Sequence, residues 1–238
     1  MKVDNSEIKL QKPMVDTVAD IIRKKIINGG IKHNFKLSTR QFSEELGISR
    51  TPVREAIRRL ESEGLIELLP RKGFIVKEYA IDKIKEIYEV RKILEIKAIN
   101  LACKNITNRE LVKIEEITQK LNRVIQNENE KEKEKILRIK KLNDEFHFAV
   151  YQASHNETLC QIIKNLWFRI SGLLIMTFSM HNRGEETLQE HEIIVRALKG
   201  RNQEVCETVL KRHMEVAERR LFECREGVIE KKKNKITR

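Results

Sequence analysis

Hydrophobic residues recur at helical spacing near the start of the chain. In residues 14–29 the apolar positions Val15, Val18, Ile22 and Ile26 lie three or four residues apart, which is the period of one face of an α-helix. A pair of glycines follows, as is common where a helix ends. The pattern predicts an amphipathic helix over this stretch.

A second helix is expected at residues 38–47, STRQFSEELG. Ser38 or Thr39 can cap its N-terminus and Gly47 can end it. Only Ile48 separates this helix from the next start signal, Ser49. Two helices joined by so short a turn are typical of a helix-turn-helix.

A third helix is predicted from about residue 50 to 63, with Ser49 as its N-cap. Pro52 is tolerated there because the first amides of a helix have no partner within it. Gly64 follows the helix, and its apolar stripe consists of Val53, Ile57 and Leu60.

Two extended segments, LIELL (65–69) and FIVKEY (74–79), flank the turn-like sequence PRKG at residues 70–73. Three helices followed by a hairpin with a basic tip describe a winged helix-turn-helix. The sequence therefore predicts a DNA-binding domain over residues 1–77.

The remainder of the chain has the composition of a helical bundle. All three prolines lie in the first 70 residues, and no glycine occurs between Gly73 and Gly172. A long stretch without either residue, rich in Glu, Lys, Ile and Leu, favours helix after helix. We expect a mainly α protein with an all-helical domain of about six helices at residues 78–225. A basic C-terminal tail, residues 226–238, is expected to fray.

Composition narrows the class of protein. The chain has 238 residues, of which 40% are hydrophobic, enough for a sizeable core. No apolar run of about 20 residues and no secretory signal are apparent, so we expect a cytoplasmic protein with no membrane partner. The four cysteines lie far apart without a CxxC motif, which favours core thiols over a disulfide framework or a zinc site.

Positive charge is concentrated at the two ends of the chain. The net charge is +12, of which residues 1–77 carry +6 and residues 225–238 carry +4. Such a distribution suggests a polyanionic partner. The tail would add non-specific attraction to phosphates.

The third helix has a face suited to DNA. Its buried stripe leaves Arg50, Arg54 and Arg58 on another side, and the first residues of such a helix reach base edges in the major groove. Arginine can contact guanine O6 and N7 together. Thr51 could reach a phosphate or a thymine methyl. Arg59 is expected instead to pair with Glu55, and a solvated arginine face is the alternative interpretation.

The segment SRTPVREAIRRLESEGLI (49–66) resembles the signature of the GntR family of bacterial transcription regulators. YEVRKILE (88–95), NDEFHFAVYQASHNETL (143–159), QEHEIIVRALKGRN (189–202) and LKRHMEVAERRL (210–221) are similar to motifs of its FadR branch, which has an all-helical FCD effector domain. The resemblance implies a repressor that binds a palindromic DNA operator as a homodimer. It places DNA contacts at Arg40, Ser49, Arg50, Thr51, Arg54, Lys72 and Gly73.

Three histidines, His147, His191 and His213, fall in separate helix-like segments, and Asn143 lies one turn before His147. Together they would suit a divalent metal with open positions, although scattered histidines are more often core residues. The resemblance implies a metal site of one Asp and three His here, for Zn, Ni or Mn. Asn143 replaces that acid, and Asp144 points about 100° away around the helix.

Arg91 is the candidate effector-binding residue, because a guanidinium pairs naturally with a carboxylate. We expect a small organic acid that bridges the metal and Arg91. A salt bridge with Glu95 is the alternative role for Arg91. A long acyl-CoA, the ligand of the branch's eponymous member, fits the histidine set less well.

Two other functions remain open at this stage. A metal-dependent enzyme could use the histidine cluster, but HEIIV (191–195) has Val195 where a zinc-protease motif requires its second histidine. A non-specific nucleic-acid-binding protein would show binding that depends on salt but not on sequence.

Overall fold

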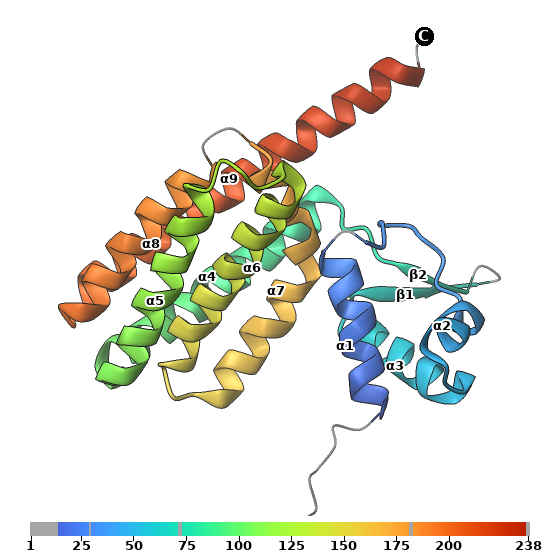
Figure 1. Cartoon of the computed structure of the whole chain (residues 1–238), viewed down its shortest axis with the longest axis horizontal. Helices are drawn as coiled ribbons and strands as arrows, with labels where there is room; N and C mark the ends of the chain where they lie inside the picture. Colours follow the sequence, from blue (N-terminus) through green and yellow to red (C-terminus); the bar gives the residue numbers. More distant parts are fainter. Residues whose placement is uncertain (1–13, 29, 71–72, 181–182, 237–238) are drawn as a thin grey trace, which may run out of the picture. The chain divides into compact units, whose positions relative to one another are not determined.

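The chain divides into two compact units, one up to Glu78 and one from Tyr79 onward. The structure is a computed structural model. It describes residues 14–28, 30–70, 73–180 and 183–236, the last twelve of them by their backbone alone. Each unit is described by itself below (Figure 1).

The described residues of the first unit form three helices, α1 to α3, as the sequence predicts. Ser38 caps α2 by accepting a hydrogen bond from the Gln41 amide at 3.2 Å, and Gly47 ends α2 in the left-handed conformation at φ 65°. Ser49 stands at the N-cap position of α3 but makes no side-chain cap hydrogen bond. The helices are α1 (Met14–Ile27), α2 (Thr39–Leu46) and α3 (Arg50–Ser62).

A two-stranded antiparallel hairpin follows α3. Strand β1 (Ile66–Leu69) pairs with β2 (Gly73–Val76) so that Ile66 lies opposite Val76 and Leu69 opposite Gly73. Gly73 has φ 79°, a backbone conformation that favours glycine because it lacks a Cβ. The predicted winged helix-turn-helix is confirmed.

The second unit is all helical, as predicted, with six helices among its described residues. Thr107 and Glu110 form a reciprocal capping box at the start of α5, a strong local start signal. The helices are α4 (Ile81–Asn105), α5 (Asn108–Ile125), α6 (Glu132–Gln152), α7 (Glu157–Phe178), α8 (Arg183–Lys199) and α9 (Gln203–Ile236).

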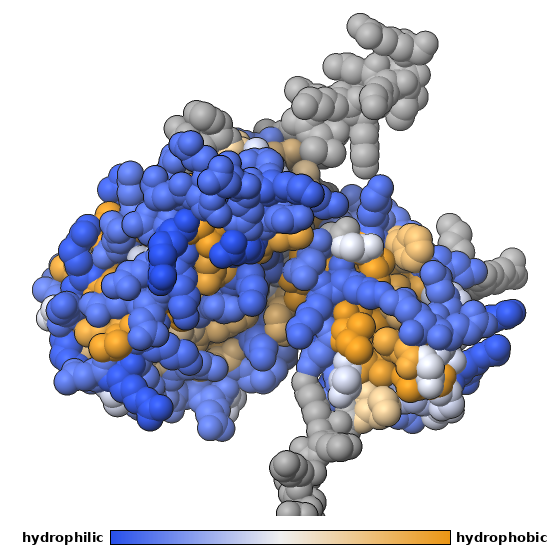
Figure 2. All heavy atoms as spheres, in the orientation of Figure 1, coloured by the Kyte–Doolittle hydropathy of each residue, from blue (hydrophilic) through white to orange (hydrophobic). Residues whose placement is uncertain are grey.

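Apolar side chains of these six helices meet in a shared core. Its largest cluster includes Phe146, Ile163, Ile194 and Leu210, which come from four different helices. Hydrophilic side chains predominate on the face of this unit seen in Figure 2. The bundle is therefore held mainly by burial of the apolar stripes that the sequence displays.

Helix α7 is the one helix in the described part of the chain long and apolar enough to cross a membrane. No such run is expected from the sequence. Contacts of α7 with α4, α6 and α9 and its buried Trp167 and Ile170 explain its apolar character as that of a core helix.

The backbone of α9 continues as helix to Ile236. It therefore runs through most of the segment that was expected to fray at residues 226–238.

Candidate functional site

The exposed face of α3 carries the predicted DNA-contacting side chains. Burial of Val53 and Ile57 turns Arg50, Thr51 and Arg54 toward solvent. Among the described residues, neither Arg50 nor Arg54 forms an ion pair. The N-terminus of α3 also has free amides and the positive end of the helix dipole, which favour a phosphate. This face is free to meet an anionic partner.

Arg59 has a different partner from the one expected. Its guanidinium pairs with Asp16 of α1 and lies 3.5 Å from Glu63, rather than pairing with Glu55. The Arg59–Glu55 prediction was wrong because α1 packs directly against α3 and brings a carboxylate closer. Arg59 therefore helps to join these two helices and is not part of the open face.

The other predicted DNA contacts are placed unevenly. Arg40 is exposed and donates to Glu44 at 2.8 Å. An exposed ion pair of this kind contributes little to stability, so a DNA phosphate could replace Glu44 as the partner of Arg40. Ser49 is exposed just before Arg50. Gly73 shapes the hairpin through its backbone, and Lys72 lies outside the described residues.

The three predicted histidines of the helical unit converge. His147 of α6, His191 of α8 and His213 of α9 are all buried, and one nitrogen of each lies within 4.8 Å of the others. The ring centroids are 4.9 Å apart for His147 and His213 and 5.1 Å for His147 and His191. Three helices thus deliver three imidazoles to one point.

Hydrogen bonds fix how two of these imidazoles carry their protons. His213 Nδ1 lies 2.7 Å from the Glu190 carboxylate, so Nδ1 is the donor. His147 Nδ1 lies 3.1 Å from the Tyr151 hydroxyl. That hydroxyl donates its only hydrogen to Glu95 and must therefore accept from His147. His147 Nε2 is therefore left as a lone pair.

These two Nε2 atoms face each other at 3.1 Å. That is a hydrogen-bond distance, so either a proton donated by one Nε2 or a cation bound by both can lie between them. Two nitrogens on one metal would stand about 2.9 Å apart at a right angle and about 3.3 Å apart at the tetrahedral angle, for metal–nitrogen bonds of about 2.0–2.1 Å. The observed separation falls between these values, so the pair fits a metal.

His191 supplies the third possible ligand. Its ring stacks on Phe146 with centroids 3.7 Å apart, and both of its ring nitrogens are buried without a hydrogen-bond partner in the described structure. Burial and the neighbouring His213 hold the pKa of His191 well below 6.5. A neutral, unpaired imidazole is the form that binds a divalent metal.

Asn143 and Asp144 are both near the cluster but have different roles. Asn143 is buried and lines the cavity beside His147, where its amide oxygen could serve as an uncharged metal ligand. Asp144 is held away by Lys140 at 2.5 Å and by Trp167 Nε1 at 3.2 Å. The expectation that Asp144 does not replace an acidic ligand at position 143 is consistent with this geometry.

Arg91 lines the same cavity. It makes the expected salt bridge with Glu95, Nε to Oε1 at 2.7 Å, and its guanidinium lies 4.4 Å from the Trp167 ring centroid. Burial alone would lower the pKa of Arg91, but Glu95 together with Tyr88 and Tyr151 more than offsets burial and raises the pKa above its ordinary value. Nη1 of this buried cation has no partner in the described structure, which leaves a donor for a ligand.

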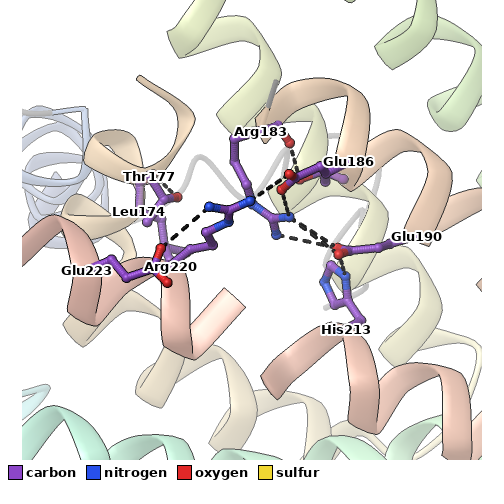
Figure 3. A network of polar contacts seen from close by, with 9 residues as sticks. Leu174, Thr177, Arg183, Glu186, Glu190, His213, Arg220 and Glu223 are labelled. Carbon is purple, nitrogen blue, oxygen red and sulfur yellow. Dashed lines mark hydrogen bonds and ion pairs between the residues drawn. The ribbon is translucent and has the colours of Figure 1, made fainter. Parts of the chain in front are cut away.

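A second buried arginine, Arg183 at the start of α8, also lines the cavity. Figure 3 shows its guanidinium turned toward Glu186 and Glu190, with Glu190 also in contact with His213. The Arg183 contacts are long, 3.4 Å to Glu186 and Glu190. Arg183 could not be predicted from the sequence, because nothing local distinguishes it from a surface charge before a helix.

One continuous series of polar contacts joins the two arginines across the histidines. Each end is a guanidinium and the middle is the His147–His213 pair. In order, it consists of Arg91, Glu95, Tyr151, His147, His213, Glu190 and Arg183.

The cavity itself is small. Its volume is about 30 Å³, room for an ion with one or two waters. Its walls come from α4, α6, α7, α8 and α9. A larger ligand must displace side chains, and Arg183 is the wall residue with the weakest contacts.

A winged helix-turn-helix joined to a helical unit with a small cavity lined by histidines and arginines is the architecture of a DNA-binding regulator with an effector domain. The chain belongs to the GntR family: residues 14–76 match the bacterial regulatory proteins of the gntR family, and residues 86–216 match the FCD domain. Proteins of this family are transcription regulators, so the enzyme alternative is rejected.

Two curated relatives and one solved structure illustrate the similarity. The chain is 32% identical over 189 residues to the HTH-type transcriptional regulator McbR of Escherichia coli (strain K12), covering 79% of this chain and 83% of McbR. It is 29% identical over 192 residues to the HTH-type transcriptional regulator YdhC of Bacillus subtilis (strain 168), covering 81% and 84%. The solved structure of E. coli McbR/YncC aligns with a TM-score of 0.78 and 28% identity, covering 90% of this chain and 99% of that one.

Proposed function

We propose that this regulator is a cytoplasmic repressor that binds a palindromic operator as a homodimer and is controlled by a small organic acid. The repressor role and the dimer are what the family resemblance implies. The effector would bind in the helical unit, on a divalent metal held by the three histidines and on Arg91. The observation that carries this proposal is the convergence of three buried imidazoles, with two Nε2 atoms 3.1 Å apart, beside an unpaired guanidinium nitrogen of Arg91.

Each protein group has a distinct task in the metal site. His147, His191 and His213 would hold Zn²⁺, Ni²⁺ or Mn²⁺, and Asn143 lies beside them as a neutral oxygen donor. Glu190 and Tyr151 orient two of the imidazoles and keep their Nδ1 atoms protonated. The metal would supply a positive charge that attracts a carboxylate.

Arg91 would hold the same ligand from the other side. The contact of its guanidinium with the Trp167 ring and its hydrogen bond to Glu95 fix the guanidinium plane. Little side-chain entropy is therefore lost when Nη1 donates to a carboxylate. The salt bridge with Glu95 and the effector role are therefore compatible.

At the DNA, the exposed face of α3 would enter the major groove of each half-site. Arg50 and Arg54 would read bases. Arg40, Ser49 and Thr51 would contact the backbone, together with Lys72 and Gly73 in the wing. Half-sites about one helical turn apart would match the two winged helices of a dimer. Effector binding would shift the dimer between conformations in which the two winged helices match this spacing and conformations in which they do not.

The test combines metal analysis with DNA binding. The untagged protein is purified without chelator and its metal content is measured by elemental analysis, with one Zn²⁺, Ni²⁺ or Mn²⁺ per chain expected. Operators are selected from random DNA and footprinted, and small carboxylates are screened for release of the operator.

An Arg91→Ala variant is then compared with the wild type in the release assay. It should bind the operator normally and lose the response to the carboxylate. An Arg91→Ala protein with the full response would refute the effector site. Binding that depends on salt but not on DNA sequence would instead favour the non-specific nucleic-acid-binding alternative.

A further inference from the structure

The charges around the cavity do not balance once a metal is present. Arg91 and Arg183 contribute two positive charges, and Glu95 and Glu190 two negative ones. Glu190 is counted as a carboxylate because it accepts from His213 Nδ1 at 2.7 Å and lies 3.4 Å from the Arg183 guanidinium. Metal-bound imidazoles and Asn143 are neutral. A divalent metal would therefore leave an excess of two positive charges.

Neighbouring charges outside the cavity do not supply the missing anion. Glu186 is engaged by Arg220 at 2.6 Å, and Asp144 is engaged by Lys140 at 2.5 Å. An excess of two charges in a buried site is costly unless an anion enters with the metal. A monoanion would neutralise half of it.

The two guanidiniums are also arranged for two anionic groups. They stand at opposite ends of the series of polar contacts through His147 and His213, and both line the cavity. Arg91 has an unpaired buried nitrogen. Arg183 has only contacts of 3.4 Å, at the weak limit for a charge-assisted hydrogen bond. Both guanidiniums can therefore donate shorter hydrogen bonds to an anionic ligand than those they make to the protein.

We propose that the effector is a small dianion, of the dicarboxylate class, with one carboxylate on the metal and Arg91 and the other on Arg183. This ligand class depends on the metal and effector site proposed above. Arg183 would exchange its long contacts with Glu186 and Glu190 for the second carboxylate and so open the small cavity. Glu190, relieved of Arg183, would keep its bond to His213.

This exchange would also carry the signal into the bundle. Arg183 is the first residue of α8, and Gly184 lets that turn pack closely: a Cβ there would lie 3.3 Å from Ile139 and 3.5 Å from Ile125. Movement of Arg183 would therefore be felt directly by α5 and α6. Arg183, which would select the dianion, is therefore next to the packing contact through which α5 and α6 would respond.

The test compares each diacid with its own half ester, which has nearly the same shape and one charge fewer. Malonate, succinate and glutarate and their monomethyl esters are titrated into the full-length, Zn²⁺-loaded protein by calorimetry. At least one diacid should bind about tenfold or more tightly than its ester, as one charge-assisted contact predicts. If all three diacids bind no better than their esters, the proposal is overturned.

Arg183→Gln and Arg220→Gln form a matched pair of variants. Arg183→Gln should reduce the preference for the diacid to about onefold and leave the ester affinity unchanged. Arg220→Gln, which alters the neighbouring arginine outside the cavity, should preserve the preference. An Arg183→Gln protein that retains it would overturn the proposal.

Asn143→Asp gives a second readout should Arg183→Gln fold poorly. The added negative charge removes one of the two excess positive charges, so the diacid should lose affinity relative to the ester. An unchanged ratio would count against the charge balance. Metal content and operator binding are measured on the same samples. Wild-type protein with metal and operator binding but no diacid preference would refute the dianion alone, and protein lacking both metal and preference would refute the metal site as well.

Discussion

Glu190 is next to His191 in the sequence, yet its carboxylate binds His213, 23 residues away on α9, at 2.7 Å. Adjacent positions on a helix point about 100° apart, so Glu190 faces α9 while His191 faces Phe146 and the other histidines. The contact sets which nitrogen of His213 carries the proton and leaves Nε2 toward His147.

Replacing Glu190 by Gln should weaken metal binding about 10–100-fold, the usual effect of losing a carboxylate that orients a histidine ligand. The amide cannot offer the same charge to His213 Nδ1. Glu186→Gln is the control, because Glu186 contacts arginines and no histidine. Competition with a coloured chelator measures both affinities, and equal values for the two variants would contradict the orienting role of Glu190.

Removing the metal should lower the free energy of unfolding of the helical unit. A ligand that binds only the folded state contributes about 4 kcal/mol when its free concentration is 1,000 times its Kd. Thermal unfolding is followed with added Zn²⁺ and with EDTA, and the Tm should fall on chelation. His191→Phe protein should show no such difference. An EDTA effect of equal size in that variant would point to metal bound elsewhere.

Without metal, the protein should lose stability as the pH falls below about 6.5. Burial, together with His213 and other neighbours, holds the pKa values of His147 and His191 well below their ordinary value of 6.5. Below pH 6.5 the unfolded chain takes up protons that the folded chain does not, so the stabilisation is complete above 6.5 and is lost toward acid. The expected slope is up to about 1.4 kcal/mol per pH unit for each histidine.

Urea unfolding in EDTA between pH 7.5 and 5.5 measures this slope. The His191→Phe protein should lose about half of the part of this slope that the histidines cause, because one of the two histidines with a lowered pKa is gone. A slope identical to that of the wild type would show that His191 does not titrate as its burial implies.

Arg50→Ala and Arg54→Ala should each weaken discrimination between the operator and unrelated DNA. A lost bidentate contact to a guanine costs about 1–3 kcal/mol. Arg59→Ala, on the same helix but paired with Asp16, should leave that discrimination unchanged. Footprinting and competition at fixed salt measure the effect. Full discrimination by both variants would remove α3 from the role of recognition helix.

The winged helix-turn-helix could be derived from the sequence because its signals are local. The cap at Ser38, the left-handed Gly47 and the stripe on α3 each act within a few residues. The absence of glycine between Gly73 and Gly172 likewise predicted the helical unit. The partner of Arg59 could not be predicted from sequence spacing, because the packing of α1 against α3 brings the Asp16 carboxylate to it in place of Glu55.

The sequence also named the three histidines, Asn143 and Arg91, but only as residues on separate helices. His147 and His213 are 66 residues apart, and their meeting depends on how α6, α8 and α9 pack. Arg183, Glu190 and Tyr151 became visible as parts of the site only in the folded chain. Helix formation is decided by neighbours along the chain, whereas a buried polar site is decided by which faces of distant helices exclude water together.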